Sequence, residues 1–531
     1  MVETLVVGLD AATPAIINRL RSEDRLPALS SLANEGISGT LSSTLPPMTP
    51  QAWTSISTGT NPGRHGIFDF RTQDRSTYRI SPIEYARMNE PTIWDMCAAR
   101  DVSVGIMNYP LATPPPHVEE FFISGIPASV DDRIAYPADV GDYLDKIEYQ
   151  VYPQSDPHEN PANYFAELQS LMETRYEASV DLAQRYDPDV LWTVFMAIDW
   201  GQHYLWNTSI SEEDAVPALY EHADDILGGY IDRFDPDTVL VLSDHGAQAI
   251  RGEIHLNSLL AHLDYLEPTT NDGNVFTRAG QWTASTAWNI GRELPHNVRE
   301  RVKRYAPDGV LDDARVAADA AGQRMLHEDI EWGSTQAFTY GSMGRVFIHR
   351  ADRYPEGTVS AAEYEPLRDH LIDDLKSVSD PRTGEPVFEA VVRAEEKYAG
   401  EYSDDGPNLL VVPRNWEYMI YGDLNDEWLH PPRQRIADHH PLGVFYAAGQ
   451  SVPTGEVTAD ITDFAPTLLY LLGLPILAGL DGEVVSGIRD SEANTPRPKY
   501  IKDAVHDRPD RTDEEAHERT VEERLDDLGY L

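Results

Sequence analysis

The segment LVVGLD, Leu5–Asp10, is an apolar run of strand length that ends in a carboxylate. The same arrangement recurs far along the chain: IDWGQH (Ile198–His203) and VLSDHG (Val241–Gly246) also place Asp or His at the end of an apolar run. An open α/β sheet gathers its functional side chains at the carboxyl edge of its strands. We therefore expect these scattered carboxylates and imidazoles to converge at one sheet edge.

Other apolar runs of strand length follow, with helical patterns between several of them. Alternation of this kind favours a mainly parallel sheet flanked by helices, so the predicted fold class is α/β. The expected strands are Thr4–Leu9, Val102–Met107, Phe121–Gly125, Val190–Ala197, Thr238–Leu242, Asn408–Val412 and Gly443–Ala448. The expected helices are Pro14–Asn34, Tyr164–Tyr186 and Ala215–Arg233.

The middle of the chain interrupts this alternation. Residues 271–325 lose their apolar periodicity, and Ser342–Tyr402 has strand and helix signals of its own. We expect a core in two parts, residues 1–265 and 406–490, with an insertion or cap at 266–405 and a charged tail at 491–531. Trp282, Trp288 and Arg292 in the cap suit either a nucleoside or glycan ligand or simple packing. Residues 525–531 form a final apolar element, expected to dock as a helix.

The charge of the chain is strongly unbalanced. Its 531 residues include 89 Asp and Glu against 42 Lys and Arg, which gives −47 at pH 7. Acidic excess with few lysines predicts adaptation to a salt-rich cytoplasm, where ions screen self-repulsion; the alternative is an ordinary acidic enzyme. Without a basic patch to displace counterions, we do not expect bulk nucleic-acid binding.

Compartment is also indicated by the sequence. A single cysteine, Cys97, excludes an internal disulfide and fits a reducing compartment. The N-terminus has no basic start or small-residue cleavage site, so no signal peptide is expected. The most apolar later window, Ile461–Leu480, contains one Asp and two Pro, which falls short of a membrane span. We expect a cytoplasmic protein, and the sequence does not indicate its oligomeric state.

Thr49-Pro50 is typical of a helix start, with Thr at the N-cap and Pro at the first helical position. A helix N-terminus presents free N–H groups and the positive end of a dipole, which suits a phosphate. Alone, such a Thr is usually only a cap, because its hydroxyl is a poor nucleophile unless a metal or base lowers its pKa. His65, in the turn GTNPGRHG (Gly59–Gly66), is expected to be an ordinary polar residue.

Two Asp-His pairs accompany this threonine. Asp199 and His203 are four residues apart, so a helical turn places both on one face. Asp244 and His245 follow a strand, and Gly246 is expected to permit the sharp turn that presents both to one pocket. Together with the carboxylate that ends the first strand, these residues are the ligand inventory of a two-cation hydrolytic site.

In this order, the motifs resemble the alkaline phosphatase superfamily, closest in style to its type I phosphodiesterase / nucleotide pyrophosphatase branch. The resemblance covers residues 1–260 and 400–490. It rests on PPMTPQAWT (Pro46–Thr54), GTNPGRHG (Gly59–Gly66), Asp199 with His203, SDHG (Ser243–Gly246), DITDFAPTLL (Asp460–Leu469) and LGY at 528–530.

The resemblance implies a metal-dependent phosphohydrolase that acts on a small phosphodiester or phosphomonoester, with Thr49 as nucleophile and a phosphothreonine intermediate. It implies two divalent cations, with Zn²⁺ as first choice and Mn²⁺ as the other candidate for mixed carboxylate and imidazole ligands. The implied ligands are Asp10, Thr49, Asp244 and His245 for the activating cation, and Asp199, His203 and His439 for the second. His439 is chosen over His440 because the family's ligand lies four residues before a glycine, here Gly443.

One departure concerns nucleotide specificity. Nucleotide pyrophosphatases carry an Asn shortly after the His-Gly turn, whereas this chain has FDFR, Phe68–Arg71. Arg64 and Arg71 are candidates for a replacement positive charge, although an Arg in such a turn is more often a surface residue. The departure leaves attack by Thr49 unaffected and makes nucleotide diesters a less secure substrate class.

Two other interpretations keep the same residues. The first is a phosphotransferase, mutase or sulfatase-like enzyme of the superfamily; sulfatases have Cys or Ser where this chain has Thr49, and a mutase would need a second phosphosugar pocket. The second is a metal-stabilised protein without catalysis. All seven expected positions are filled, which argues against a protein that has lost its activity.

Overall fold

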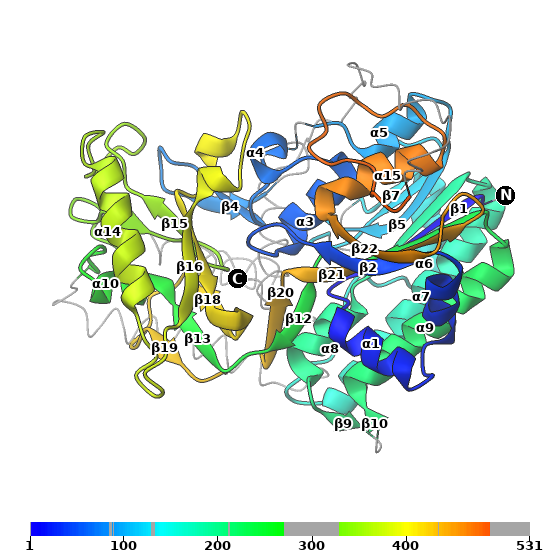
Figure 1. Cartoon of the computed structure of the whole chain (residues 1–531), viewed down its shortest axis with the longest axis horizontal. Helices are drawn as coiled ribbons and strands as arrows, with labels where there is room; N and C mark the ends of the chain where they lie inside the picture. Colours follow the sequence, from blue (N-terminus) through cyan, green and yellow to red (C-terminus); the bar gives the residue numbers. More distant parts are fainter. Residues whose placement is uncertain are drawn as a thin grey trace, which may run out of the picture.

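A nine-stranded sheet organises the larger lobe of the protein (Figure 1). The computed structural model describes residues 2–83, 88, 90–128, 133–210, 213–269, 329–433 and 435–488. The sheet order is β22-β2-β21-β11-β1-β8-β5-β6-β7. Its strands are β1 Thr4–Leu9, β2 Ile37–Ser42, β5 Val104–Tyr109, β6 Phe121–Ser124, β7 Ala135–Tyr136, β8 Val190–Phe195, β11 Thr238–Leu242, β21 Leu442–Gly449 and β22 Gly455–Asp460.

The sheet is mainly parallel, as predicted. Strands β11, β1, β8, β5 and β6 run in the same direction as successive neighbours, while β21 and β7 run against their neighbours. All six residues of β1, β5 and β8 are buried. Continuous apolar runs of this kind are required where helices cover both faces of a parallel sheet. The α/β fold class is therefore confirmed.

Helices cover both faces of the sheet (Figure 1). On one face lie α3 (Thr49–Thr58), α5 (Ile93–Ala98) and α15 (Phe464–Leu471), and near them the short α4 (Pro62–His65). The other face carries α1 (Pro14–Ser22), α2 (Pro27–Glu35), α7 (Pro161–Tyr186), α8 (Ala197–Leu205) and α9 (Ala215–Phe234); α6 is Ala138–Lys146.

The single helix predicted at Pro14–Asn34 is wrong, because the structure has two helices there. Helix α1 ends at Ser22, and Asp24 has a left-handed φ of 57° that turns the chain. Pro27 then begins α2, where its missing N–H costs nothing. The apolar spacing continues through the break, so periodicity alone did not reveal it.

A smaller lobe has its own sheets and core, formed mainly by the described residues 252–269 and 329–430. One sheet has the order β14-β15-β17-β16 and the other β18-β13-β19. These elements are β13 Gly252–His255, β14 Ala337–Phe338, β15 Arg345–Ile348, β16 Phe388–Arg393, β17 Leu409–Pro413, β18 Tyr418–Tyr421 and β19 Leu429–His430, with helices α10 Leu256–His262 and α14 Tyr364–Ser377. Its core packs Ile254, Phe338, Phe347, Leu371 and Val411.

The strand expected at Asn408–Val412 is present as β17, but it belongs to this smaller lobe and not to the main sheet. It pairs with β16 and β15, both antiparallel. An apolar run specifies a buried strand without specifying its partners, which explains the difference. The division at residues 265 and 406 remains a prediction. Residues 271–325, with Trp282, Trp288 and Arg292, and the tail from residue 491 lie outside the described residues.

Two short strands connect the lobes. The chain leaves the main sheet through β12 (Gly246–Ala249) and returns through β20 (Ala437–His440), and the two pair antiparallel with Ala247 opposite His439. The other elements of the described residues are β3 Arg71–Gln73, β4 Ile80–Pro82, β9 Ser209–Ile210, β10 Glu213–Asp214 and the 3₁₀ turns Ala394–Glu396, Ser403–Asp405, Arg414–Trp416 and Ile461–Asp463. Among the described helices, none has the length and apolar character needed to cross a membrane.

His65 is a satisfied polar residue in its turn, as expected. It is fully buried; its Nδ1 accepts a hydrogen bond from the Ile67 N–H at 3.1 Å, and its Nε2 lies 3.0 Å from the Ser55 hydroxyl. Because Nδ1 accepts, the ring proton sits on Nε2 and is donated to Ser55. Burial lowers the pKa of His65 to about 3.

This histidine should make stability fall in mild acid. Below pH 6.5, the ordinary pKa of histidine, His65 binds a proton in the unfolded chain, whereas in the folded protein it binds one only below about pH 3. The free energy of unfolding therefore decreases as the pH falls through this window. Between pH 7.5 and 5.5 the loss from His65 is about 1.4 kcal/mol. His65→Asn keeps an acceptor for the Ile67 N–H and cannot titrate. Urea unfolding should show a smaller change with pH for this variant; an equal change would contradict the assignment.

Candidate metal centre

Three parallel strands deliver three carboxylates to one edge of the main sheet. Asp10 follows β1, Asp199 lies in the first turn of α8 just after β8, and Asp244 follows β11. These strands are immediate neighbours in the order β11-β1-β8. All three side chains are fully buried. The convergence expected from the sequence is present.

Asp10, Asp244 and His245 form the first cluster, with one ligand atom of each within 4.8 Å of the others. His245 Nε2 lies 3.2 Å from Asp244 Oδ2 and 3.8 Å from Asp10 Oδ1. The other oxygens of the two carboxylates accept hydrogen bonds from the Trp53 ring N–H (2.8 Å) and the Ala11 backbone N–H (3.3 Å). Trp53 and Ala11 therefore hold the carboxylates in fixed orientations.

The oxygens that face His245 have no hydrogen-bond donor among the described residues. Asp10 Oδ1 and Asp244 Oδ2 are both buried without a hydrogen-bond partner. A buried carboxylate oxygen in this condition is costly unless a cation or donor compensates it. The first cluster thus has the chemistry of a cation site.

Thr49 lies beside this cluster but is not the N-cap that the sequence suggested. Met48 is the N-cap, Thr49 is the first residue of α3, and Pro50 is the second. The Thr49 side chain makes no capping bond; its hydroxyl lies 3.4 Å from His245 Nε2. Because Thr49 is fully buried at a helix N-terminus, its hydroxyl faces both the positive end of the helix and the carboxylate cluster.

Asp199, His203 and His439 form the second cluster. Asp199 Oδ1 is 3.1 Å from His203 Nε2 and 3.5 Å from His439 Nε2, and the two imidazole nitrogens are 3.2 Å apart. The i, i+4 placement of Asp199 and His203 on α8 is as predicted. His440, the alternative to His439, is only half-buried, and its Nδ1 accepts from the Leu442 N–H at 3.2 Å.

All three imidazoles present the same nitrogen to the site. Nδ1 of His203 contacts the Ala437 carbonyl at 2.9 Å, Nδ1 of His439 contacts the Pro47 carbonyl at 2.8 Å, and Nδ1 of His245 contacts its neighbour's carbonyl at 3.1 Å. A carbonyl only accepts, so each Nδ1 carries a proton and donates it. Each Nε2 then faces the carboxylates, which is the arrangement of metal-ligating histidines.

The two clusters are contiguous. The rings of His245 and His439 stack with their centroids 3.8 Å apart, and Asp199, His245 and His439 also place ligand atoms within 4.8 Å of one another. The β12–β20 pairing produces this contact, because it sets His439 opposite Ala247. Gly246 was expected to permit a sharp turn, but its φ is not left-handed. A glycine is needed there for a different reason, because a Cβ would collide with the Leu442 carbonyl oxygen.

Electrostatics distinguish the carboxylates. Burial, and then the charges of the neighbouring carboxylates, raise the pKa of Asp10 well above its usual value, while burial raises the pKa of Asp244 to about 8. Burial opposes ionisation of Asp199 too, but His203 and His439 outweigh it and hold its pKa well below the usual range. Burial also lowers the pKa of His245. Such opposed shifts among packed groups are common at functional sites.

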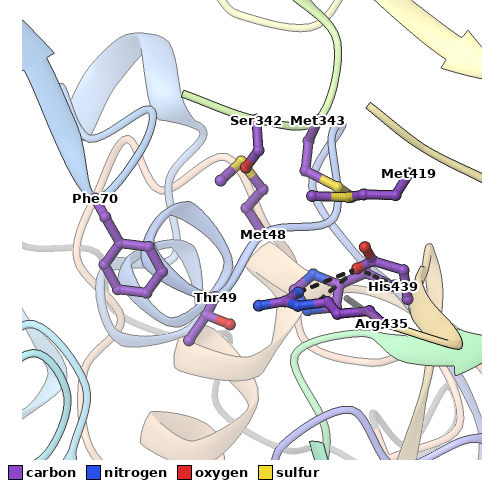
Figure 2. Close-up of a pocket in the computed structure, with 9 residues that line it drawn as sticks. Met48, Thr49, Phe70, Ser342, Met343, Met419, Arg435 and His439 are labelled. Atoms are coloured by element: carbon purple, nitrogen blue, oxygen red, sulfur yellow. Dashed lines mark hydrogen bonds and ion pairs between the residues drawn. The ribbon is translucent and has the colours of Figure 1, made fainter. Parts of the chain in front are cut away.

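A hollow opens beside Thr49 and His439 (Figure 2). The unoccupied space within it, including part open to solvent, is about 230 Å³. Its walls come from both lobes, and Figure 2 shows Met48, Met343 and Met419 on one side and Thr49, Arg435 and His439 on the other. The hollow suits a small substrate that reaches Thr49.

Sequence reasoning missed Arg435 and Asp438, which also line this hollow. Asp438 directly precedes His439, a signal that could have been used, whereas nothing in the sequence marks Arg435. Arg64 and Arg71, the arginines proposed from the sequence, do not line the hollow. Arg64 forms ion pairs with Glu90 (2.8 Å) and Asp481 (3.4 Å) outside the site. Arg71 opens β3.

Comparisons with known proteins agree with this architecture. The family model described as "Type I phosphodiesterase / nucleotide pyrophosphatase" matches residues 4–441. Phosphonoacetate hydrolase from Sinorhizobium meliloti 1021 in complex with phosphonoacetate has a TM-score of 0.54 at 15% identity, over 86% of this chain and 92% of that chain. Its complex with phosphonoformate gives 0.52 at 13%, over 86% and 92%. Murine ectonucleotide pyrophosphatase / phosphodiesterase 5 gives 0.48 at 12%, over 89% and 95%. No curated protein matches the chain. At these identities the first two structures show the shared fold alone.

Proposed function

The chain belongs to the type I phosphodiesterase / nucleotide pyrophosphatase family, a group of hydrolases of phosphoric ester bonds, and on that premise we propose that Thr49 is its nucleophile and that two divalent cations assist it. The observation that carries the proposal is the position of the Thr49 hydroxyl, 3.4 Å from His245 Nε2 in a fully buried cluster of carboxylates and imidazoles. Met48, not Thr49, is the N-cap of α3, and the contact recorded for the Thr49 hydroxyl is with His245 Nε2.

The residues present fit two cations. Asp10, Asp244 and His245, together with the Thr49 hydroxyl, would hold the first; Asp199, His203 and His439 would hold the second. The buried unpartnered oxygens of Asp10 and Asp244 and the Nε2 atoms turned inward support this assignment. Bound there, the cations would supply Lewis acidity that lowers the pKa of the attacking hydroxyl and neutralises charge on the departing oxygen. Mixed oxygen and imidazole ligands suit Zn²⁺ first and Mn²⁺ second.

The chain's own groups divide the remaining work. Oγ1 of Thr49 forms a bond to phosphorus as the bond to the leaving oxygen breaks, and the hydroxyl proton passes to that oxygen, giving a phosphothreonine and the free alcohol. A water then attacks phosphorus and the bond to Thr49 breaks, which returns the hydroxyl. The N-terminus of α3 lies at Thr49, so its free N–H groups would face the phosphoryl oxygens of a bound ester, and this preorganised dipole would stabilise their charge.

The first test of the proposal is hydrolysis of 4-nitrophenyl phosphate and bis(4-nitrophenyl) phosphate by the full chain in multimolar KCl. We expect turnover with added Zn²⁺ or Mn²⁺ and its loss with a chelator, restored by excess metal. Turnover that is unchanged by chelation would refute the role of the cations. Metal binding without hydrolysis of either ester would favour a transferase or a non-catalytic relative.

We also propose that the protein works in a salt-rich, reducing cytoplasm. Its charge of −47 supports the first point. A single cysteine, Cys97, which leaves no possibility of an internal disulfide, supports the second. Dialysis from about 3 M KCl into dilute buffer should remove the screening and unfold the chain. A native circular dichroism spectrum in dilute buffer would contradict the salt adaptation.

A further inference from the structure

Arg175 is a buried cation that takes no part in the proposed mechanism. It lies inside α7, and its side chain is fully buried. Three other arginines are buried among the described residues, and each has a carboxylate within 4.0 Å: Asp69 for Arg345, Glu395 for Arg368 and Asp438 for Arg435. The described part of the chain provides no such partner for Arg175. Because a buried arginine is almost always paired with an acid, Arg175 requires another explanation.

The protein groups around the Arg175 guanidinium are all neutral. Its Nη2 donates to the Val151 carbonyl at 2.6 Å, and its Cζ lies 6.0 Å from the ring centroid of Trp200. Burial raises the pKa of Tyr149 and the positive charge of Arg175 opposes that rise, which places the phenol near the guanidinium. A carbonyl, an indole ring and a neutral phenol can hold the guanidinium in place, but none of them balances its charge.

Several donors in this region are not used within the described protein. Nε and Nη1 of Arg175 are buried without a hydrogen-bond partner, and so is the ring N–H of Trp200. Buried N–H groups of these side chains normally have an acceptor, because an unpaired donor costs free energy. A guanidinium cannot avoid the cost by losing its proton. A neutral acceptor would complete the hydrogen bonds but leave the charge uncompensated, so the acceptor that these donors require is an anion.

We propose that Arg175 and Trp200 form a binding site for a small monovalent inorganic anion, which is chloride in a salt-rich cell. One guanidinium is balanced by one negative charge, and the full burial of both side chains favours an ion without an organic part. The site joins α7 to α8, the helix that carries Asp199 and His203. Neither Arg175 nor Trp200 belongs to the metal clusters or lines the hollow, so the proposal is independent of the proposed function.

Crystals of the full chain grown in about 3 M KBr test the site directly, because this concentration fills even a weak site and bromide, unlike water, scatters anomalously. We expect an anomalous peak within hydrogen-bond distance of the Arg175 guanidinium and the Trp200 ring N–H. No such peak is expected at Arg345 or Arg368, whose carboxylates already balance them. A water without anomalous signal at Arg175, or no density there, would overturn the proposal.

Urea unfolding tests the same site in solution. Chloride is raised from zero to about 3 M while potassium glutamate keeps the ionic strength constant, since glutamate is too large for a buried site and screens surface charges equally. A site with a dissociation constant of about 0.1 M would raise the folding equilibrium constant about 30-fold over this range. We expect a saturating increase of this kind for the wild type and its loss in Arg175→Met.

Arg368→Met is the matched control, because it removes a buried arginine that already has a carboxylate partner. This variant should be less stable at every chloride concentration and should keep the wild-type response to chloride. A response that is unchanged in Arg175→Met, or lost equally in both variants, would overturn the proposal, because chloride would then act elsewhere or on the overall charge. The bromide crystals need only the wild type, so they decide the proposal even if Arg175→Met fails to fold.

Discussion

Thr49→Ala is expected to lower kcat/KM for nitrophenyl esters by about 10⁴-fold, because it removes the atom that attacks phosphorus and leaves only direct attack by water. The change should leave the fold intact, since the Thr49 hydroxyl makes no capping bond in α3. Rates should be measured at saturating metal, with the metal content of wild type and variant determined in parallel. A variant that binds metal normally and retains more than a tenth of the wild-type rate would exclude Thr49 as nucleophile.

Two matched changes sharpen this result. Thr49→Ser retains a hydroxyl and should keep substantial activity. Thr54→Ala makes the same chemical change five residues later in α3. The Thr54 hydroxyl donates to the Pro50 carbonyl at 2.6 Å and belongs to neither metal cluster. We expect little loss of rate for Thr54→Ala. A similar loss in both alanine variants would indicate damage to α3 and not removal of a nucleophile.

Arg345→Met is expected to lower the free energy of unfolding by about 3–5 kcal/mol, because it leaves a buried carboxylate without its cation. Arg345 is fully buried in β15 and forms an ion pair with Asp69, which is 2% exposed. The guanidinium also donates to the carbonyls of Phe68 and Ser342, each at 3.2 Å. This cluster joins the segment after α4 to the smaller lobe.

The double variant Arg345→Met/Asp69→Asn separates charge from lost hydrogen bonds. The asparagine side chain carries no charge and still has an oxygen that can accept from the Phe70 N–H, as the Asp69 carboxylate does at 2.6 Å. We expect urea unfolding in high salt to show the double variant to be more stable than Arg345→Met alone. If the double variant is no more stable, the cost arises from the lost carbonyl contacts.

The Arg345–Asp69 pair shows how the segment Phe68–Arg71 is used in this protein. The sequence shows that this segment lacks the Asn found in nucleotide pyrophosphatases, but it does not show which contacts the residues present here make. Asp69 is committed to Arg345, and Gly341 is required beside them, because a Cβ at that position would collide with Asp69 Oδ2. Phe70 lines the hollow in this segment, and Arg71 does not. Partners 276 residues apart cannot be inferred from local pattern.

Much of the site followed from sequence because its signals are local. A carboxylate at the end of a buried strand, an Asp and a His four apart on a helix, and a resemblance in motif order were enough to select Asp10, Thr49, Asp199, His203, Asp244, His245 and His439. The structure brings all seven together. Their roles remain proposals that the experiments above test.

The sequence by itself determined the α/β class and the negative net charge, which depend on short-range periodicity and composition. Through the resemblance in motif order it also selected the seven candidate residues. Only the tertiary structure decided the partners of β17, the stacking of His245 on His439, the burial of Arg435 beside Thr49 and the Arg345–Asp69 pair. Each of these depends on the register between segments far apart in the chain. Hydrophobic burial requires that such segments pack, but their register is set by the fit of many side chains at once, which no single segment encodes.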